Sequence, residues 1–137
     1  TLTEQNQRSR PAKPQYESLI LGLNFRNREE LYRRIDLRVE QMLAQGLEQE
    51  VRALDLHHCS RTARQAIGYA QFLDYLDGTV DLARTVERIK MESRRYAKRQ
   101  LTWLRRDSRI VWFYPDVMDF NNILNNCGKS IANFLNV

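Results

Sequence analysis

Residues 82–106 read LARTVERIKMESRRYAKRQLTWLRR. The spacing of apolar and basic residues in this segment is the main basis for the predicted fold. Asp81 precedes it and can cap a helix, which would be roughly 37 Å long at ~1.5 Å per residue. The apolar side chains recur at helical spacing and lie at Val86, Ile89, Tyr96, Ala97, Leu101 and Leu104. Cations occupy the other faces, at Arg84, Arg88, Arg94, Arg95, Lys98, Arg99, Arg105 and Arg106. We therefore expect an apolar stripe that packs against other helices and a basic stripe that faces solvent.

The net charge of the 137-residue chain is +5, and the excess is concentrated around this helix. Residues 84–109 hold ten Lys and Arg against three Asp and Glu. The positive electrostatic field of such a cluster attracts a nucleic acid, an anionic membrane or a diphosphate ligand. The alternative is a helix face that is merely solvated. The composition, 42% hydrophobic and 28% charged, indicates one folded, helix-rich domain. No apolar run approaches the ~18 residues of a membrane span, so we expect a cytoplasmic protein.

The segment before the long helix predicts three more helical regions. The first follows an Asn27 cap, carries apolar residues at helical spacing and ends at Gly46. The second is broken at residues 57–60. The third, residues 67–76, ends at the turn of residues 77 and 78, which are Asp and Gly.

The remaining segments complete a mainly α fold with two short strands. The apolar runs 19–25 and 110–114 are typical of strands buried on both faces of a parallel sheet, which needs more strands than this chain supplies. Residues 1–15 predict a polar linker, and residues 117–137 contain a terminal amphipathic helix. Residues 16–116 then form the helical region between them.

Two apparent motifs lack the spacing that their chemistry needs. Residues 128–130 (Gly-Lys-Ser) end like a phosphate-binding loop, but Ile123 stands where the first glycine belongs and no strand precedes the motif. Residues 57–59 (His-His-Cys) are adjacent in one loop, and no matching group of ligands occurs elsewhere. We therefore expect neither a phosphate loop nor a metal site in this chain.

Two other features attract an anion. Arg38 lies at the edge of the apolar arc of its helix, where the guanidinium either holds a phosphate oxygen or pairs with a carboxylate such as Glu50 or Asp36. Residues 93–100 (SRRYAKRQ) combine cations with an amide and an aromatic ring. This combination is the strongest RNA-facing signal in the sequence, and a solvated basic face is its alternative.

Several motifs, taken in order, then match one family. They are residues 31–42 (LYRRIDLRVEQM), 46–54 (GLEQEVRAL), 65–71 (QAIGYAQ), 75–78 (YLDG) and 95–105 (RYAKRQLTWLR). Over residues 16–116 the chain resembles the C-terminal part of the tRNA dimethylallyltransferases, also called tRNA isopentenylpyrophosphate transferases. The resemblance implies tRNA modification: the dimethylallyl group of dimethylallyl diphosphate passes to the exocyclic amine of the adenosine 3′ of the anticodon, which must leave its stack to react.

The resemblance also implies roles for individual residues. Arg38 would be catalytic, close to the diphosphate or the reacting centre. The anticodon arm of tRNA would contact two segments, namely Gln65, Ala66, Ile67, Gly68, Tyr69, Ala70 and Gln71 in the first, and Ser93, Arg94, Arg95, Tyr96, Ala97, Lys98, Arg99 and Gln100 in the second. The family usually has Lys or Arg at position 70 and Thr at position 93, so the alanine removes one expected phosphate contact.

In the family a P-loop and Mg²⁺ hold the diphosphate, and an N-terminal Asp acts as general base. Because these motifs do not occur here, we expect a monomeric C-terminal portion that is inactive alone and has no membrane partner. Its strands would complete the parallel sheet of an absent P-loop α/β core. Two alternatives stay open: an autonomous, non-catalytic RNA-binding helical module, and a structural interaction domain whose strands pair with a partner chain.

Overall fold

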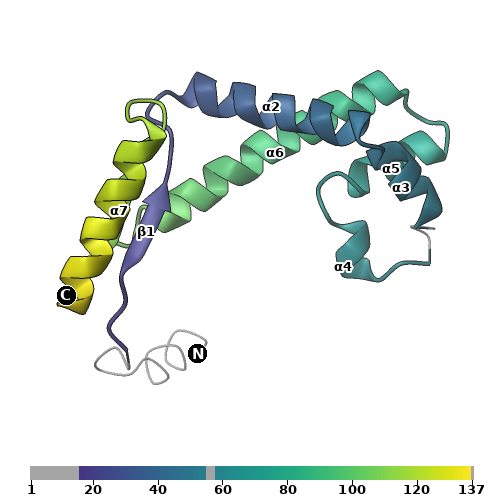
Figure 1. Cartoon of the computed structure of the whole chain (residues 1–137). Helices are drawn as coiled ribbons and strands as arrows, with labels where there is room; N and C mark the ends of the chain where they lie inside the picture. Colours follow the sequence, from purple (N-terminus) through teal and green to yellow (C-terminus); the bar gives the residue numbers. More distant parts are fainter. Residues whose placement is uncertain (1–15, 55–57, 137) are drawn as a thin grey trace. The chain divides into compact units, whose positions relative to one another are not determined.

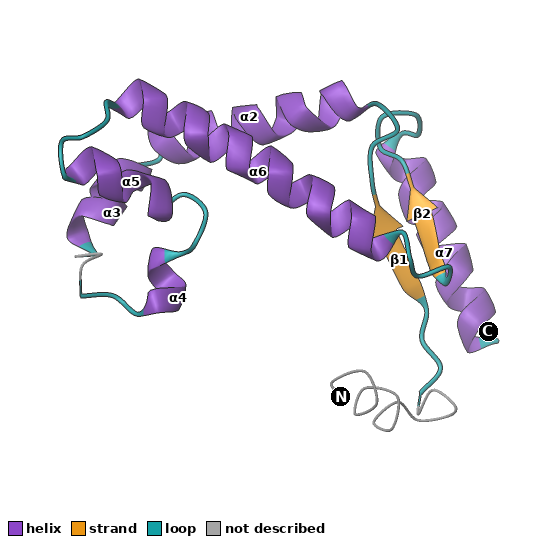
Figure 2. Cartoon of the chain, turned by 180° about the vertical axis from the view of Figure 1, so that it is seen from behind, coloured by secondary structure: helices purple, strands orange, loops and turns teal. Residues whose placement is uncertain are grey.

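The computed structural model describes residues 16–54 and 58–136, so the predicted linker 1–15 and His57 lie outside the described residues. The fold is mainly helical with two strands, as predicted (Figure 1, Figure 2). Its elements follow in the order β1 (Ile20–Leu23), α2 (Arg28–Ala44), α3 (Leu47–Ala53), α4 (Arg61–Arg64), α5 (Ala70–Leu76), α6 (Leu82–Leu104), β2 (Ile110–Phe113) and α7 (Phe120–Leu135). They form two compact units, a helical unit of residues 25–108 and a strand unit of residues 16–24 and 109–136.

Two long helices, α2 and α6, pack against each other in the helical unit (Figure 1). The side chain of Asn27 accepts a hydrogen bond from the backbone N–H of Glu29 at 2.9 Å, and that of Asp81 accepts one from Arg84 at 2.7 Å. Each cap satisfies a backbone donor that the first turn of the helix leaves without a partner. Both predicted helix starts are confirmed.

The core of the helical unit lies where α2 and α6 meet the short helices. Its buried apolar side chains come from α2, α3, α5 and α6, and they are Val39, Leu47, Val51, Phe72 and Ile89. The Phe72 ring meets Tyr75 edge-on, with 5.8 Å between the ring centroids. Thr85 is also fully buried, and its hydroxyl donates to the Asp81 carbonyl at 3.0 Å, so this polar group is satisfied inside the core.

Ion pairs tie α6 to its neighbours. Arg94 donates to both carboxylate oxygens of Asp36 on α2, at 2.7 and 2.6 Å, and Lys90 pairs with Glu40 at 2.8 Å. The Arg94 side chain is only 28% exposed. The prediction that it faces solvent with the basic stripe is therefore wrong, because periodicity within one helix does not reveal an acid on another. Tyr96, assigned to the packed stripe, is instead 47% exposed.

The third predicted helical region, residues 67–76, contains α5, whereas the short helix α4 before it was not predicted. Gly68 has φ +100°, a left-handed conformation that glycine adopts without strain, and it separates α4 from α5. The Gln71 side-chain oxygen accepts a hydrogen bond from the Gly68 N–H at 2.9 Å and is buried with it. This local bond closes the turn that the apolar spacing alone did not predict.

In the strand unit, β1 and β2 pair in parallel. The register places Ile20 opposite Ile110 and Gly22 opposite Trp112. A Cβ at Gly22 would lie 2.7 Å from an Ile110 methyl and 2.8 Å from the Trp112 ring, so the close approach of the strands requires glycine here.

The strands are less buried than the sequence predicted. Leu23 is 65% exposed and Val111 is 41% exposed, whereas burial on both faces was expected. Within the part of the chain that the structure describes, the sheet has only these two strands, so each has one edge without a strand partner. Parallel pairs of this kind normally belong to larger sheets covered on both faces.

The last helix, α7, belongs to the strand unit and lies within residues 117–137, where a terminal helix was predicted. Asp119 caps it by accepting from the backbone N–H of Asn122 at 2.9 Å. Residues 128–130 lie inside this helix and not in a loop after a strand, which confirms that they form no phosphate loop. Of its apolar side chains Ile123 is buried, while five are at least 40% exposed, namely Phe120, Leu124, Ile131, Phe134 and Leu135.

We predict that the Asp36–Arg94 pair stabilises the packing of α2 on α6. Asp36→Ala and Arg94→Ala should each lower the free energy of unfolding, and the double variant should lose less than the sum, with a coupling of about 1 kcal/mol for a half-buried pair. Urea unfolding of the four chains measures this coupling.

The matched control is Arg95→Ala. Arg95 pairs with Glu92 inside its own helix at 2.7 Å and is 59% exposed, so its removal should change the stability by less than about 0.5 kcal/mol. Strictly additive losses for Asp36 and Arg94 would show that the pair has no energetic role.

Candidate functional site

A groove of about 770 Å³ lies between α2, the turn after α4, and α6. It is lined by residues of all three segments that the sequence singled out, together with apolar neighbours: Ile35, Arg38, Val39, Met42, Gln65, Ala66, Ile67, Ser93, Tyr96, Ala97, Arg99 and Gln100. The fold thus brings together residues that are up to 65 positions apart in the chain, from 35 to 100. This groove is the candidate functional site.

Arg38 enters the groove from α2 without a carboxylate partner. Asp36 is bound by Arg94, and Glu50 accepts from the Tyr69 hydroxyl, so both alternative partners of Arg38 are engaged elsewhere. Among the described residues, no hydrogen bond or ion pair joins the Arg38 guanidinium to another side chain. An exposed guanidinium that lines a groove without an acid is available to an anionic ligand.

The segment of residues 65–71 is divided between the groove and the interior. Gln65 and Ala66 are exposed and line the groove. Gly68 and Gln71 are buried and bonded to each other, and the Tyr69 hydroxyl donates to the Glu50 carboxylate. This hydrogen bond raises the pKa of Tyr69, since the carboxylate stabilises the protonated hydroxyl. The outer residues of the segment are therefore placed for ligand contact and the inner ones hold its shape.

The segment of residues 93–100 divides in the same way. Ser93, Ala97 and Gln100 line the groove, and the Arg99 guanidinium lies 5.8 Å from the centre of the Tyr96 ring. Lys98 lines two neighbouring hollows instead of the groove. Arg94 is held by Asp36 and Arg95 by Glu92, as described above. The cations of this segment that lack an acidic partner among the described residues are thus Lys98 and Arg99.

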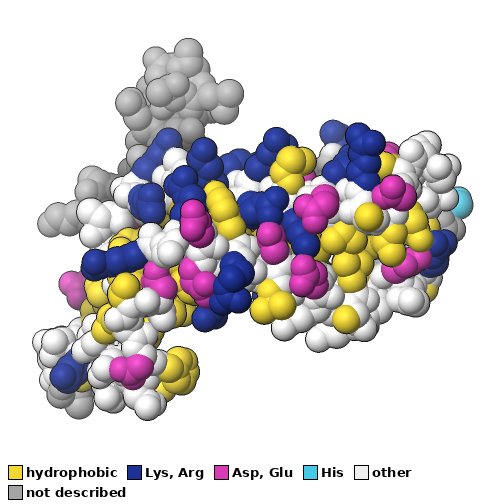
Figure 3. All heavy atoms as spheres, turned by 90° about the horizontal axis from the view of Figure 1, so that it is seen from above, with side chains coloured by type: hydrophobic (Ala, Val, Ile, Leu, Met, Phe, Trp, Pro, Cys, Tyr) yellow, Lys and Arg dark blue, Asp and Glu magenta, His cyan; other side chains and the backbone are white. Residues whose placement is uncertain are grey.

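Acidic partners are common on this chain, which makes an unpartnered cation informative. Figure 3 shows Lys and Arg side chains interspersed with Asp and Glu side chains over one face. On α2, Arg33 and Arg34 both bind the Glu30 carboxylate, at 2.8 and 3.1 Å. These hydrogen bonds, that of Arg33 first, lower the pKa of Glu30 to about 2.

Sequence reasoning missed Trp103 as a site residue. Its side chain is 70% exposed on α6, in a shallow hollow of about 420 Å³ that it shares with Arg95, Lys98, Arg99, Thr102 and Arg106. The spacing of four between Arg95, Arg99 and Trp103 was the available signal, because residues four apart lie on one helix face. An exposed indole among cations is a surface on which a nucleobase can stack.

No group of three or more His, Cys, Asp or Glu side chains in the described part of the chain could hold a metal ion. We therefore assign no Mg²⁺ ligand to these residues. None of the described helices combines the length and the apolarity needed to cross a membrane.

The chain is thus a helical module, in which two long helices carry unpaired cations, amides and aromatic rings, joined to a parallel pair of strands. A family model described as IPP transferase matches residues 1–107. The chain belongs to the IPP transferase family, which confirms the resemblance inferred from its motifs.

Similar proteins carry names that agree with this family. The chain is 40% identical over 125 residues to a tRNA dimethylallyltransferase of Heliobacterium modesticaldum, and the aligned region covers 90% of this chain and 39% of that protein. It is 52% identical over 101 residues to the tRNA dimethylallyltransferase of Geobacillus kaustophilus, and this aligned region covers 72% of this chain and 31% of that protein.

Solved structures agree in fold. The full-length tRNA isopentenylpyrophosphate transferase of Bacillus halodurans matches with a TM-score of 0.81 and 39% identity, over 89% of this chain and 40% of that one. The tRNA delta(2)-isopentenylpyrophosphate transferase of Staphylococcus epidermidis matches with a TM-score of 0.79 and 35% identity, over 86% and 39%. The chain thus spans about two fifths of the length of these proteins.

We predict that the Tyr69–Glu50 hydrogen bond makes stability depend on alkaline pH. A raised pKa means that its contribution is fully present below the ordinary value of 10.0 and is lost as pH rises through the higher folded value. Tyr69→Phe should therefore be less stable than the parent chain by about 1 kcal/mol at pH 8, and this difference should shrink above pH 10. Urea unfolding at several pH values measures it.

Tyr16→Phe is the matched control, because Tyr16 is 76% exposed. It should follow the parent chain at every pH. If Tyr69→Phe stays less stable than the parent chain by the same free energy above the pH range where tyrosine ionises, the loss of stability does not come from the Tyr69 hydroxyl.

Proposed function

We propose that this chain is the tRNA-contacting, C-terminal portion of a tRNA dimethylallyltransferase. The whole enzyme would transfer the dimethylallyl group of dimethylallyl diphosphate to the exocyclic amine of the adenosine 3′ of the anticodon. The observation that carries the proposal is the groove, which gathers Arg38 and parts of the segments 65–71 and 93–100 in a chain of the IPP transferase family.

In this proposal the groove and α6 have different tasks. Arg38 stabilises negative charge on the departing diphosphate, a role that its unpaired, fixed-charge guanidinium suits. Lys98 and Arg99 neutralise phosphates of the anticodon arm, while Tyr96 and Trp103 offer faces for unstacked bases. The P-loop, Mg²⁺ and the general base belong to a separate N-terminal domain, and the cytoplasm is the proposed location. The chain alone should bind RNA and transfer no prenyl group.

The competing proposal, an autonomous RNA-binding module, uses the same surface without catalysis. The outer edges of β1 and β2, which have no strand partner among the described residues, favour the enzyme, because a parallel pair is normally part of a larger sheet. An experiment on Arg38 therefore separates the two proposals, and an experiment on Arg99 tests what they share.

We predict that Arg99→Ala weakens binding to an unmodified anticodon stem-loop with adenosine 3′ of the anticodon. The slope of log affinity against log salt should become shallower by about one unit, because one phosphate contact is lost. Fluorescence anisotropy of the labelled stem-loop across salt concentrations measures this slope, with an unrelated hairpin as competitor. Arg84→Ala is the matched control, since Arg84 is an exposed cation ~22 Å away along the same helix. A slope that stays the same in Arg99→Ala would remove this side chain from the interface.

We predict that Arg38→Ala impairs transfer far more than tRNA binding. The test joins this chain to the N-terminal part of the Geobacillus kaustophilus relative and follows labelled dimethylallyl diphosphate into tRNA. The rate constant should fall by roughly a hundredfold, as for loss of one charge-stabilising donor, while tRNA affinity stays unchanged. Arg33→Ala, whose side chain is bound by Glu30 on the same helix, is the control. Equal losses of rate and affinity would assign Arg38 to tRNA binding.

A further inference from the structure

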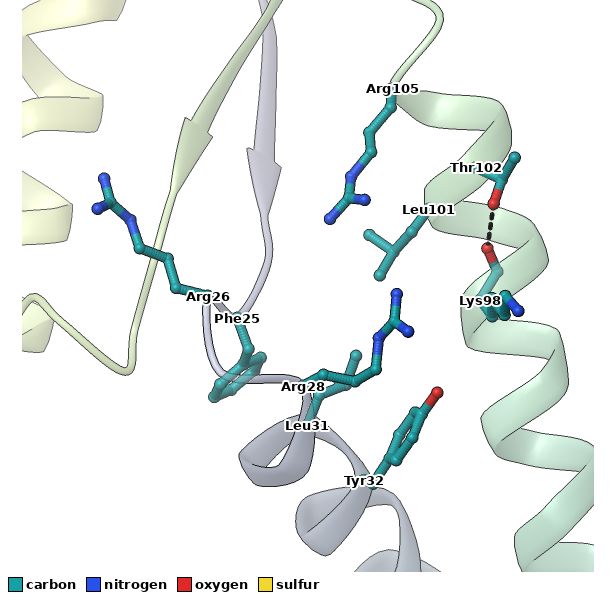
Figure 4. Close-up of a pocket in the computed structure, with 9 residues that line it drawn as sticks. All are labelled: Phe25, Arg26, Arg28, Leu31, Tyr32, Lys98, Leu101, Thr102 and Arg105. Carbon is teal, nitrogen blue, oxygen red and sulfur yellow. Dashed lines mark hydrogen bonds between the residues drawn. The ribbon is translucent and has the colours of Figure 1, made fainter.

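A second hollow of about 410 Å³ lies at the other end of the α2–α6 pair (Figure 4). Leu31 and Leu101 give it an apolar part, and Arg28 and Arg105 reach toward each other from the start of α2 and the end of α6. Lys98 and Tyr32 also line the hollow. The hollow therefore collects three cations from two helices that are distant in the sequence, and Arg26 lines it as a fourth cation from the segment before α2.

Among the residues that the structure describes, no acidic side chain lines this hollow. Within the ranges that the structure describes, Arg28, Lys98 and Arg105 have no ion pair, in contrast to Arg33 and Arg34 on the other side of α2, which share Glu30. Like charges that converge without a counter-charge repel one another, and the repulsion is relieved when an anion enters.

The position of Arg28 adds a second, independent observation. It is the first residue of a 17-residue helix, where the helix dipole disfavours a cation and favours an anion. A cation that opposes the dipole, faces a second guanidinium and forms no ion pair among the described residues does not stabilise the fold. Its placement is explained by a ligand with negative charge.

We propose that Arg28, Lys98 and Arg105 form a binding site for a phosphate group. Two guanidiniums offer paired N–H donors that match phosphate oxygens, and the Lys98 ammonium adds a third charge. The Tyr32 hydroxyl is a further donor at the rim. The carrier of the phosphate is either the backbone of an RNA or a small diphosphate, and the site does not depend on which proposed function of the chain holds.

The test compares the parent chain with Arg28→Gln and Arg105→Gln, with Arg33→Gln as the control that leaves the hollow intact. Thermal unfolding is followed with sodium diphosphate or with sodium chloride at equal ionic strength, and RNA affinity is followed by anisotropy of the stem-loop. Diphosphate should raise the midpoint of the parent and of Arg33→Gln more than chloride does, and this difference should be lost in the two hollow variants. Without ligand the hollow variants should melt at or above the parent temperature, because they relieve repulsion, whereas a structural role would lower it.

The RNA titration separates the two carriers. If the phosphate belongs to RNA, Arg28→Gln and Arg105→Gln should each weaken stem-loop binding about threefold to tenfold and reduce the salt slope by about one unit. If it belongs to a small diphosphate, only the thermal shift should respond. Hollow variants that match Arg33→Gln in every measurement would overturn the site, even if Arg99→Ala shows that the chain binds RNA. Binding of diphosphate without any RNA affinity would uphold the site and remove the RNA-binding function.

Discussion

The packing of α2 against α6 is the constraint on which the rest of the helical unit depends. Val39 and Ile89 are buried in the core that the two helices share, and two ion pairs, Asp36–Arg94 and Glu40–Lys90, stand one helical turn apart on both helices. Because the acids lie four residues apart on α2 and the cations four residues apart on α6, both pairs form together in one antiparallel register. That register sets which residues face one another across the groove, and a slip by one turn would bury a charge without its partner.

This packing also sorts the cations of α6 into two groups. Arg94 and Lys90 form ion pairs with acids of α2. Their positive charge therefore stabilises the fold and contributes little to the electrostatic potential at the surface. Lys98 and Arg99 lie further along the helix, where α2 presents no acid to them, so their charge is available to a ligand. The net charge of the region, high as it is, does not distinguish these groups. Only the identity of the residue across the helix interface does.

The sequence was a good guide wherever a signal is local and a poor one wherever it depends on a partner. The caps at Asn27 and Asp81 predicted the starts of α2 and α6 correctly, and the apolar spacing predicted α7, because capping and periodicity are properties of a single helix. The turn at Gly68 was missed, since its closing bond comes from the side chain of Gln71 and not from spacing. For the site, the three segments were found through motifs, whereas the engagement of Arg94 and the exposure of Trp103 follow from packing between elements.

The parallel pairing of β1 and β2 explains why so much of the chain is helical. Parallel neighbours cannot be joined by a tight turn and need a crossover, and here residues 24–109, which include the whole helical unit, form that crossover. Chain connectivity then places Arg28 five positions after the last residue of β1, in the segment that leaves the carboxyl end of a parallel strand. A cation that opposes its helix dipole at this point of the chain costs stability, and a phosphate ligand is the physical reason for keeping it there.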